Sequence, residues 1–198
     1  LLQGGDLSCV IRERQNSNKL FSEVQVLEWF IQLLLGVRYL HKRLVLHRDL
    51  KASNIFLKDG TLKIVVIVPG DFGVSRILLG ALDFASTFTG TPHYMSPEVF
   101  TCSGYNSKSD IWSLGCVLYE ICALDLAFDA RSWVKLLMKI VHGPSPSLPE
   151  SFSEELNHIL HRMLNKDPMV RPSAAEILKL PYVAENVKVR SLFILTSL

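Results

Sequence analysis

The chain has 198 residues, which suits one domain or one lobe of a larger domain. Hydrophobic residues make up 48% and charged residues 20%, a balance that excludes an intrinsically disordered chain. The net charge of +2 gives no reason to expect binding to nucleic acid or to a membrane surface.

The cysteines indicate a reducing compartment. None of the four forms a C-x-x-C pair, so neither a disulfide framework nor a zinc site is expected. We therefore expect free thiols and an intracellular protein, in the cytoplasm, the nucleus or both. No apolar run approaches the ~18 residues that cross a bilayer. The first residues lack the features of a targeting peptide and read as a chain already under way.

Two helices are predicted before the first motif. A short one is expected over about 6–14, and a longer one over 22–41. Ser22 and Gln25 have the spacing of a capping box at the start of the longer helix. Apolar residues then recur at helical spacing, which predicts one buried face. These residues are Leu27, Phe30, Ile31 and Leu34.

Short strands are predicted next. The segments 45–46, 55–57 and 62–68 are strand-like, and the Asp59-Gly60 pair between the last two predicts a hairpin turn. The segment from about 71 to 105 has little periodicity and is expected to be a loop.

The second half is predicted to be helical. The segment 110–122 is apolar nearly all round, which is typical of a helix buried at the centre of a domain. Asp110 is placed to cap its start. Ser173 and Glu176 have capping-box spacing. Further helices are expected over 132–141, 153–164 and 173–179, and the pattern is lost beyond about Val183.

Two segments carry oxygen ligands suited to phosphoryl transfer. The segment 47–54 places Asp49 and Asn54 on one short loop between strands. Asp71-Phe72-Gly73 adds a second carboxylate after the next strand, and hairpin geometry could bring Asp71 near Asn54. Carboxylate and amide oxygens are ligands that Mg²⁺ prefers. Phosphoryl transfer itself needs chiefly positioned metal ions and a positioned hydroxyl.

Three motifs occur in the order that protein kinases have. They are H-R-D-L-K-x-x-N at 47–54, D-F-G at 71–73 and G-T-P-H-Y-M-S-P-E at 90–98. Further resembling residues are Asn54-Ile55-Phe56-Leu57 and the runs 108–116, 164–168 and 171–173. On these residues the chain resembles the NIMA-related serine/threonine kinases from about residue 4 to 182.

This resemblance implies an α+β, protein-kinase-like fold. The expected part is the predominantly α-helical large lobe, over 1–183, with short β-hairpins at the active site. The small β-rich lobe would be missing, and 184–198 would be a divergent tail. The implied reaction uses ATP and Mg²⁺ to phosphorylate serine and threonine hydroxyls of protein substrates.

The same resemblance implies roles for residues of the active site. Asp49 would accept the proton of the substrate hydroxyl, and Lys51 would steady the γ-phosphate. Asn54 and Asp71 would hold Mg²⁺. Thr91 would contact the acceptor and the catalytic loop, the name used from here on for the segment 47–54.

Other implied roles concern the nucleotide and regulation. Asp6 would contact the ATP ribose, although it could equally be only a helix cap, and Phe56 would floor the adenine pocket. Arg48 would pair with a phosphate on the activation loop. Thr87 is the favoured site of that phosphate, although a plain solvated loop is an equal alternative; Ser86 and Thr89 are further candidates.

Four residues are implied to be structural. His47 would pack inside the lobe, and Asp110 would hold the backbone of the catalytic loop. Glu98 and Arg171 would form a buried ion pair, which costs about 3–5 kcal/mol to break because one charge is left unpaired.

Two departures from the family pattern temper these expectations. The sequence has no G-x-G loop and no V-A-I-K lysine, the parts that clamp ATP phosphates. We therefore expect weak ATP binding and little activity from this chain, and an inactive fragment serving as an interaction module is the alternative function. The insert Val65–Pro69 precedes Gly70 and must bulge or displace Asp71; a gene-model error is one hypothesis for it.

Overall fold

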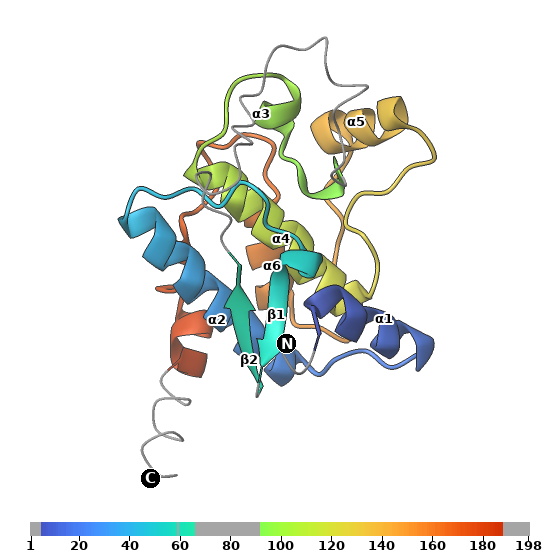
Figure 1. The fold of residues 1–198 in the computed structure, drawn as a ribbon, viewed down its shortest axis with the longest axis vertical. Helices are drawn as coiled ribbons and strands as arrows, with labels where there is room; N and C mark the ends of the chain where they lie inside the picture. The colour runs from blue at the N-terminus through green and yellow to red at the C-terminus, as the bar shows by residue number, and fades with distance from the viewer. Residues whose placement is uncertain (1–4, 59, 66–91, 188–198) are drawn as a thin grey trace.

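The computed structural model describes residues 5–58, 60–65 and 92–187 (Figure 1). Most of these residues are helical, and the described strands form one two-stranded antiparallel sheet, as the α+β expectation requires. In chain order the elements are α1 (Leu7–Asn16), α2 (Glu23–Lys42), η1 (Ala52–Asn54), β1 (Ile55–Lys58), β2 (Thr61–Ile64), η2 (Pro92–Tyr94), α3 (Pro97–Phe100), α4 (Ser107–Ala123), α5 (Trp133–His142), α6 (Glu154–Met163) and α7 (Ala174–Ile177). Residues 181–187 are also helical.

Helices α2 and α4 form the centre of the molecule. They pack against each other, and α4 also contacts α6 and η2 (Figure 1). Helix α4 is apolar over most of its surface, and most of its residues are buried, as predicted. Trp112 stacks on Phe128 with 5.3 Å between the ring centroids. This interior fixes the position of the loops that leave α2 and enter α4.

The β1–β2 hairpin lies against α2 (Figure 1). Its register pairs Ile55 with Ile64 and Lys58 with Thr61, so the predicted turn is confirmed. Gly60 adopts φ 72°, the left-handed conformation that the Asp-Gly pair predicted. A hydrogen bond of 2.8 Å from the Leu62 amide to Gln32 Oε1 ties the hairpin to α2.

Most of the longer helices begin directly after a polar residue that caps their first turn. Ser22, Ser132, Ser153 and Ser173 each cap the helix that they were expected to begin, and Ser173 forms the predicted capping box with Glu176. The cap of α4 is different. Asn106 caps that helix and forms a capping box with Ser109, so the predicted cap at Asp110 is wrong.

Two further expectations for local structure are wrong. The segment 45–46 is not a strand, since Val45 donates its amide to the Leu40 carbonyl in a turn that ends α2. Within the segment expected to be loop, η2 and α3 are short helices. Pro97 at the first position of α3 explains part of that miss, because its fixed φ suits a helix start.

All four cysteines are free, as expected: Cys9 and Cys102 are exposed, and Cys116 and Cys122 are buried. Among the described residues, the helices are either too short or too polar to cross a bilayer.

Candidate functional site

The catalytic-loop segment 47–54 brings three polar side chains together. Lys51 Nζ lies 3.0 Å from Asp49 Oδ2. Asn54 Nδ2 donates to the same oxygen at 2.8 Å and to the Asp49 carbonyl oxygen, also at 2.8 Å. The Asp49 side chain nevertheless remains 53% exposed. The loop therefore holds an ionisable carboxylate in a fixed orientation while leaving it open to an approaching group.

The backbone of this loop is strained at Arg48 and is held by hydrogen bonds to a side chain of α4. Arg48 has φ 68°, a left-handed conformation that costs a non-glycine residue about 1–2 kcal/mol. The Asp110 carboxylate, which is fully buried, accepts the Arg48 amide at 3.1 Å and the His47 amide at 3.0 Å. The expected contact between Asp110 and the loop backbone is thus present, and it explains why the strained conformation persists.

Asp110 stays ionised in spite of its burial. Desolvation raises the pKa of its carboxyl, but hydrogen bonds from His41, Tyr105 and the two loop amides outweigh that effect and lower it. A buried carboxylate that accepts several hydrogen bonds is a strong acceptor for backbone amides. Helix α4 therefore carries a fixed negative charge directly beneath the loop.

His47 is buried and neutral, in keeping with a structural role. The Asp49 amide donates to its Nδ1 at 3.3 Å, so the proton sits on Nε2, which lies 2.8 Å from the Val65 carbonyl oxygen. Burial lowers the pKa of His47, and this outweighs the opposing effects of the Val65 carbonyl, Asp110 and Asp49. The ring thus connects the catalytic loop to the residue that follows β2.

Asn54 stands where the loop enters the hairpin. It ends η1, and its carbonyl oxygen accepts the Val65 amide at 3.1 Å. Because Nδ2 is committed to Asp49, the side-chain Oδ1 is the atom left for a ligand. A hard cation such as Mg²⁺ prefers an amide oxygen of this kind, so the donor fits the predicted metal.

Asp6 lies beside Phe56, on the edge of β1 that does not pair with β2. They form an isolated β-bridge, and the Leu57 amide donates to the Gly5 carbonyl at 3.2 Å. Asp6 is the N-cap of α1 and accepts the Cys9 amide at 2.9 Å, so it does cap a helix, and its contact with the ATP ribose stays a prediction. Burial raises the pKa of Asp6, but hydrogen bonds from Ser8 and Cys9 lower it overall. Phe56 is half-buried.

Glu98 and Arg171 form the ion pair that the family resemblance implied. Two parallel hydrogen bonds of 2.7 Å join the guanidinium to the carboxylate, and both side chains are almost wholly buried. Ser109 adds a hydrogen bond of 2.6 Å to Glu98. Burial raises the pKa of Glu98, but the bonds from Arg171 and Ser109 lower it overall. The pair ties α3 to the loop after α6.

Arg171 has further partners. It donates to the carbonyl oxygens of Asn165 at 2.6 Å, Lys108 at 3.0 Å and Lys166 at 3.2 Å, and its guanidinium lies over the Trp112 ring. Since every direction of the guanidinium is used, the charge is buried without an unsatisfied donor.

Three predicted site residues lie outside the described part of the chain. They are Asp71, Thr87 and Thr91, and most of the insert Val65–Pro69 lies there as well. Among the described residues, no three side chains of His, Cys, Asp or Glu gather as a metal site. The contribution of Asp71 to a metal site therefore stays a prediction.

Sequence reasoning missed two groups of polar residues. His41 and Tyr105 both bind Asp110, but they lie 69 and 5 positions away from it, and no spacing rule pairs them. Tyr94 donates to Glu120 Oε2 at 2.5 Å. The last pair had a signal in the sequence, because Glu120 is an acidic residue in the mainly apolar second half of the central helix.

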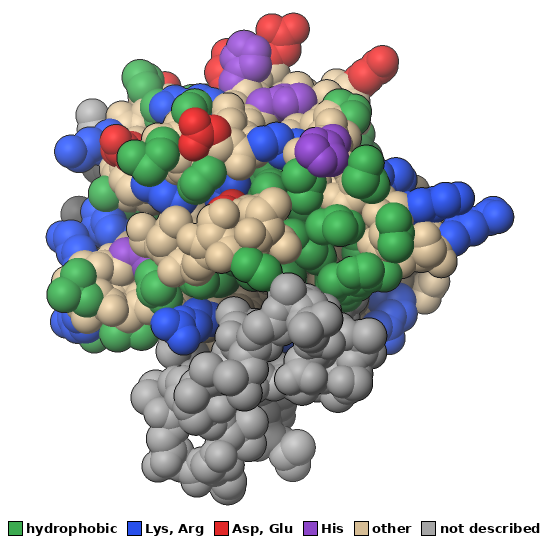
Figure 2. All heavy atoms as spheres, turned by 90° about the horizontal axis from the view of Figure 1, so that it is seen from above, with side chains coloured by type: hydrophobic (Ala, Val, Ile, Leu, Met, Phe, Trp, Pro, Cys, Tyr) green, Lys and Arg blue, Asp and Glu red, His purple; other side chains and the backbone are tan. Residues whose placement is uncertain are grey.

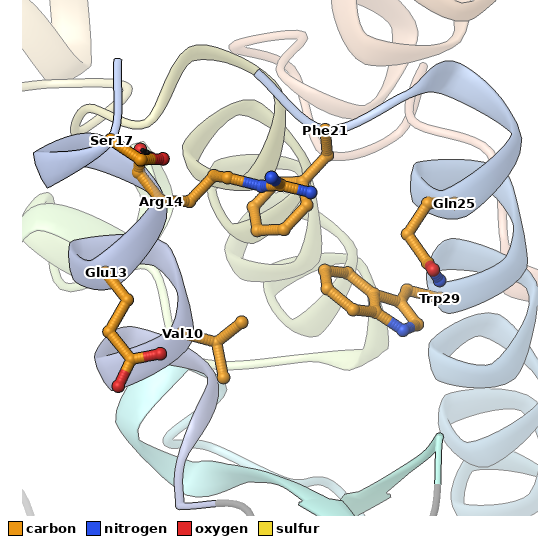
Figure 3. Close-up of a pocket in the computed structure, with 7 residues that line it drawn as sticks. All are labelled: Val10, Glu13, Arg14, Ser17, Phe21, Gln25 and Trp29. Atoms are coloured by element: carbon orange, nitrogen blue, oxygen red, sulfur yellow. Dashed lines mark hydrogen bonds between the residues drawn. The ribbon is translucent and has the colours of Figure 1, made fainter. Parts of the chain in front are cut away.

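A separate hollow lies between α1 and the start of α2 (Figure 3). Its volume is about 370 Å³, and Phe21 and Trp29 meet edge to face at 5.0 Å in its wall. The Arg14 guanidinium lies 4.7 Å from the Phe21 ring centroid. The lining residues are Val10, Glu13, Arg14, Ser17, Phe21, Gln25 and Trp29. None of them belongs to the catalytic loop.

The face seen from above Figure 1 mixes apolar and basic side chains. Figure 2 shows hydrophobic side chains gathered on this face, with lysines and arginines among and beside them. Exposed large hydrophobic residues on α5 are Trp133, Val134 and Met138. Among the described residues on the face in view, the basic side chains do not merge into one continuous stripe.

Comparison with known proteins places this arrangement in a family. The model of the protein kinase domain matches residues 1–183. The chain is 56% identical over 186 residues to the mouse serine/threonine-protein kinase Nek11, a match that covers 94% of this chain and 29% of that protein. Human Nek11 is 55% identical, with 94% and 28% covered.

A third relative shows the same relationship. Mouse serine/threonine-protein kinase Nek3 is 48% identical over 176 residues, covering 88% of this chain and 33% of that protein. The chain thus spans a third or less of the length of these relatives.

Proposed function

Because this chain belongs to the protein kinase family and is homologous to the Nek serine/threonine kinases, we propose that it forms the catalytic-loop lobe of a serine/threonine protein kinase. The lobe would serve transfer of the γ-phosphate of MgATP to serine and threonine hydroxyls of protein substrates. One observation carries the proposal: Asp49 is exposed and is oriented by both Lys51 and Asn54.

Asp49 is the proposed base. Its carboxylate accepts hydrogen bonds rather than donating them, and it stays open to an approaching hydroxyl. The Lys51 ammonium beside it would meet the transferred phosphoryl group, where negative charge accumulates in the reaction. Asn54 would keep the carboxylate turned outward. A general base must lie within hydrogen-bond reach of the proton that it takes, and an oriented loop provides that condition.

The nucleotide and metal would bind beside the same loop. Asn54 Oδ1 and the carboxylate of Asp71 are the proposed Mg²⁺ ligands, and Asp6 and Phe56 would contact the ribose and the adenine. Bound Mg²⁺ would neutralise charge on the β- and γ-phosphates. Two observations support this arrangement: the free side-chain oxygen of Asn54, and the β-bridge between Asp6 and Phe56.

Regulation and acceptor binding complete the proposal. Arg48 is exposed, and it would pair with a phosphate on Thr87. Thr91 would contact the catalytic loop and the acceptor hydroxyl. These roles rest on the positions of the residues in the kinase motifs.

The experiment compares the 198-residue chain with a version that carries a protein-kinase small lobe ahead of Gly5. Each is incubated with MgATP and matched peptides that offer a serine, a threonine or a tyrosine. We expect phosphorylation of serine and threonine peptides by the version with the small lobe and little turnover by the 198-residue chain. An ATP-dependent thermal shift on both proteins reports nucleotide binding separately from turnover.

Absence of transfer by the version with the small lobe, despite a clear ATP-dependent shift, would favour the inactive interaction module instead. Ordinary turnover by the 198-residue chain would contradict the expectation that the small lobe is required.

A further inference from the structure

We propose that the outer face of α5 is a docking surface for an acidic amphipathic helix of a partner protein. Helix α5 is apolar on two sides. Leu136 and Ile140 are buried on its inner side. Val134 and Met138, which are neighbours on the outer side because they lie four residues apart, are 65% and 53% exposed. Docking at this face is independent of the proposed phosphoryl transfer.

The exposed apolar residues of α5 lie beside others on the same surface. Trp133 is 37% exposed, and its ring centroid lies 5.3 Å from that of the half-buried Phe100 in α3. Figure 2 shows hydrophobic side chains gathered on the face seen from above Figure 1. Scattered single hydrophobic residues are normal on a protein surface, but a group of neighbouring ones marks a site of association. We call this group the α5 patch, and its members are Phe100, Trp133, Val134, Leu137 and Met138.

Basic residues border the α5 patch on one side. Helical spacing places Lys135, Lys139 and His142 next to the exposed apolar row, and α5 contains no aspartate or glutamate. Within the described part of the chain, Lys135 makes no ion pair within 4 Å. The nearest acidic residue in the sequence is Asp129, whose carboxylate lies 3.2 Å from His93 Nε2. The positive charge beside the patch therefore favours an acidic partner.

The spacing of the exposed residues favours a partner that is itself a helix. Side chains four residues apart form a ridge, and such a ridge packs into the groove between the ridges of a second helix. A helix with apolar residues at i, i+4 and i+7 would cover Val134 and Met138. Glutamates or aspartates along the edge of that helix would lie near Lys135, where oppositely charged groups both orient the partner and select it.

An anionic membrane suits the same surface less well than a protein does. A helix that binds a membrane surface sinks a broad apolar face into the boundary between headgroups and acyl chains. On α5 the side that carries Leu136 and Ile140 is already packed inside the protein. In addition, Asp129 just before the helix has a side chain that is mostly exposed, and an anionic surface would repel it.

Trp133 provides a reporter for the test. The chain has three tryptophans, and the other two, Trp29 and Trp112, are buried. Quenching of tryptophan emission by acrylamide in the 198-residue chain therefore reports chiefly on Trp133. The probe is a synthetic helical peptide of about 14 residues, with leucines at i, i+4, i+7 and i+11 and glutamates beside them. Binding should protect Trp133 from the quencher, and added salt should weaken binding.

Two matched peptides separate charge from apolar contact without any change to the protein. One carries lysine in place of every glutamate, and the other carries serine in place of every leucine. Each should bind at least about tenfold more weakly than the acidic peptide, since the first meets like charge and the second loses the buried methylene groups.

Variants of the protein locate the site. Lys135→Glu should weaken binding of the acidic peptide about three- to tenfold. Val134→Ser combined with Met138→Ser should weaken it by about tenfold or more, because each buried methylene contributes a factor of about four. Lys179→Glu and Met169→Ser change an exposed cation and an exposed apolar residue outside α5, and both should leave binding unchanged.

Three results with the peptides would overturn the docking surface: no binding of the acidic peptide at about 1 mM, equal binding of the acidic and lysine peptides, or equal effects of the α5 and control variants. Sedimentation of the chain alone tests a second copy as the occupant. A dimer that the Val134 and Met138 substitutions dissociate would overturn the assignment to a partner protein. Protection of Trp133 by vesicles of phosphatidylserine and phosphatidylcholine, without protection by the acidic peptide, would overturn it in favour of a membrane.

Discussion

Tyr94 donates a hydrogen bond of 2.5 Å to Glu120, a carboxyl group that is only 8% exposed. Burial raises the pKa of Glu120 to about 7; the bond from Tyr94 opposes this shift and the charge of Asp125 adds to it. Among the described residues, Glu120 has no ion-pair partner within 4 Å. The contact therefore joins η2 to the central helix through a group that titrates near neutrality.

This contact predicts a pH-dependent stability. Because the folded-state pKa lies above the ordinary value of 4.5, the folded protein binds the proton more tightly. The contribution of Glu120 is thus fully present below about pH 4.5 and is lost as the pH rises through about 7. Glu120→Gln should remove that dependence and raise the free energy of unfolding at pH 8 by about 1–3 kcal/mol. Urea denaturation at a series of pH values across this range measures the free energy of unfolding. Glu150→Gln, at an exposed position, is the control. If the free energy of unfolding of Glu120→Gln depends on pH as steeply as that of the parent protein, the raised pKa of Glu120 is contradicted.

The Glu98–Arg171 pair predicts a large loss of stability. Arg171→Met leaves the Glu98 carboxylate buried, with Ser109 as its remaining side-chain hydrogen-bond partner among the described residues. Removing one partner of a buried pair costs about 3–5 kcal/mol. The matched control is Arg162→Met, at an exposed position on α6, which should change stability by less than about 0.5 kcal/mol. Thermal unfolding of both variants gives the comparison, and similar losses in the two would show that the pair is not special.

Helix α4 packs so closely against the end of α6 at Gly115 that a larger side chain does not fit there. A β-carbon there would lie 2.9 Å from Leu164 Cδ2 and 3.2 Å from Met163 Cβ. Gly115→Ala should therefore destabilise the protein by about 1–3 kcal/mol through overpacking. Gly36 is the control within a helix, since its added carbon would meet only the flexible end of Ile64. Gly36→Ala should be neutral or stabilising, because alanine favours helix by about 1 kcal/mol. Equal effects of the two substitutions would argue against the packing account.

The sequence was informative where a pattern is local. Helical periodicity and serine caps located α2, α5 and α6 to within one or two residues, and the Asp59-Gly60 pair located the hairpin turn. The start of α4 was misplaced because Asp110 and Asn106 are both good caps and lie one turn apart. Asp110 is used instead beneath the catalytic loop, a contact with residues 62 and 63 positions away that periodicity does not encode.

The site was predictable as a set of residues but not as a network. The kinase motifs identified Asp49, Lys51 and Asn54, and the structure brings these three together. His41 and Tyr105, which bind Asp110, belong to none of the three motifs, and only the packing of α2 on α4 brings His41 to Asp110. Such positions depend on tertiary contacts, which a reading of neighbouring residues does not provide.

The measurement that tests the central claim most directly is the rate of phosphoryl transfer by Asp49→Asn, in the version that carries a small lobe. Asparagine keeps the size of the side chain but removes the basic carboxylate, so the rate should fall about 10²- to 10⁴-fold. Ser53→Ala, at an exposed position in the same loop, should leave the rate unchanged. An Asp49→Asn protein that retains the parent rate would contradict the account of this loop as a catalytic site.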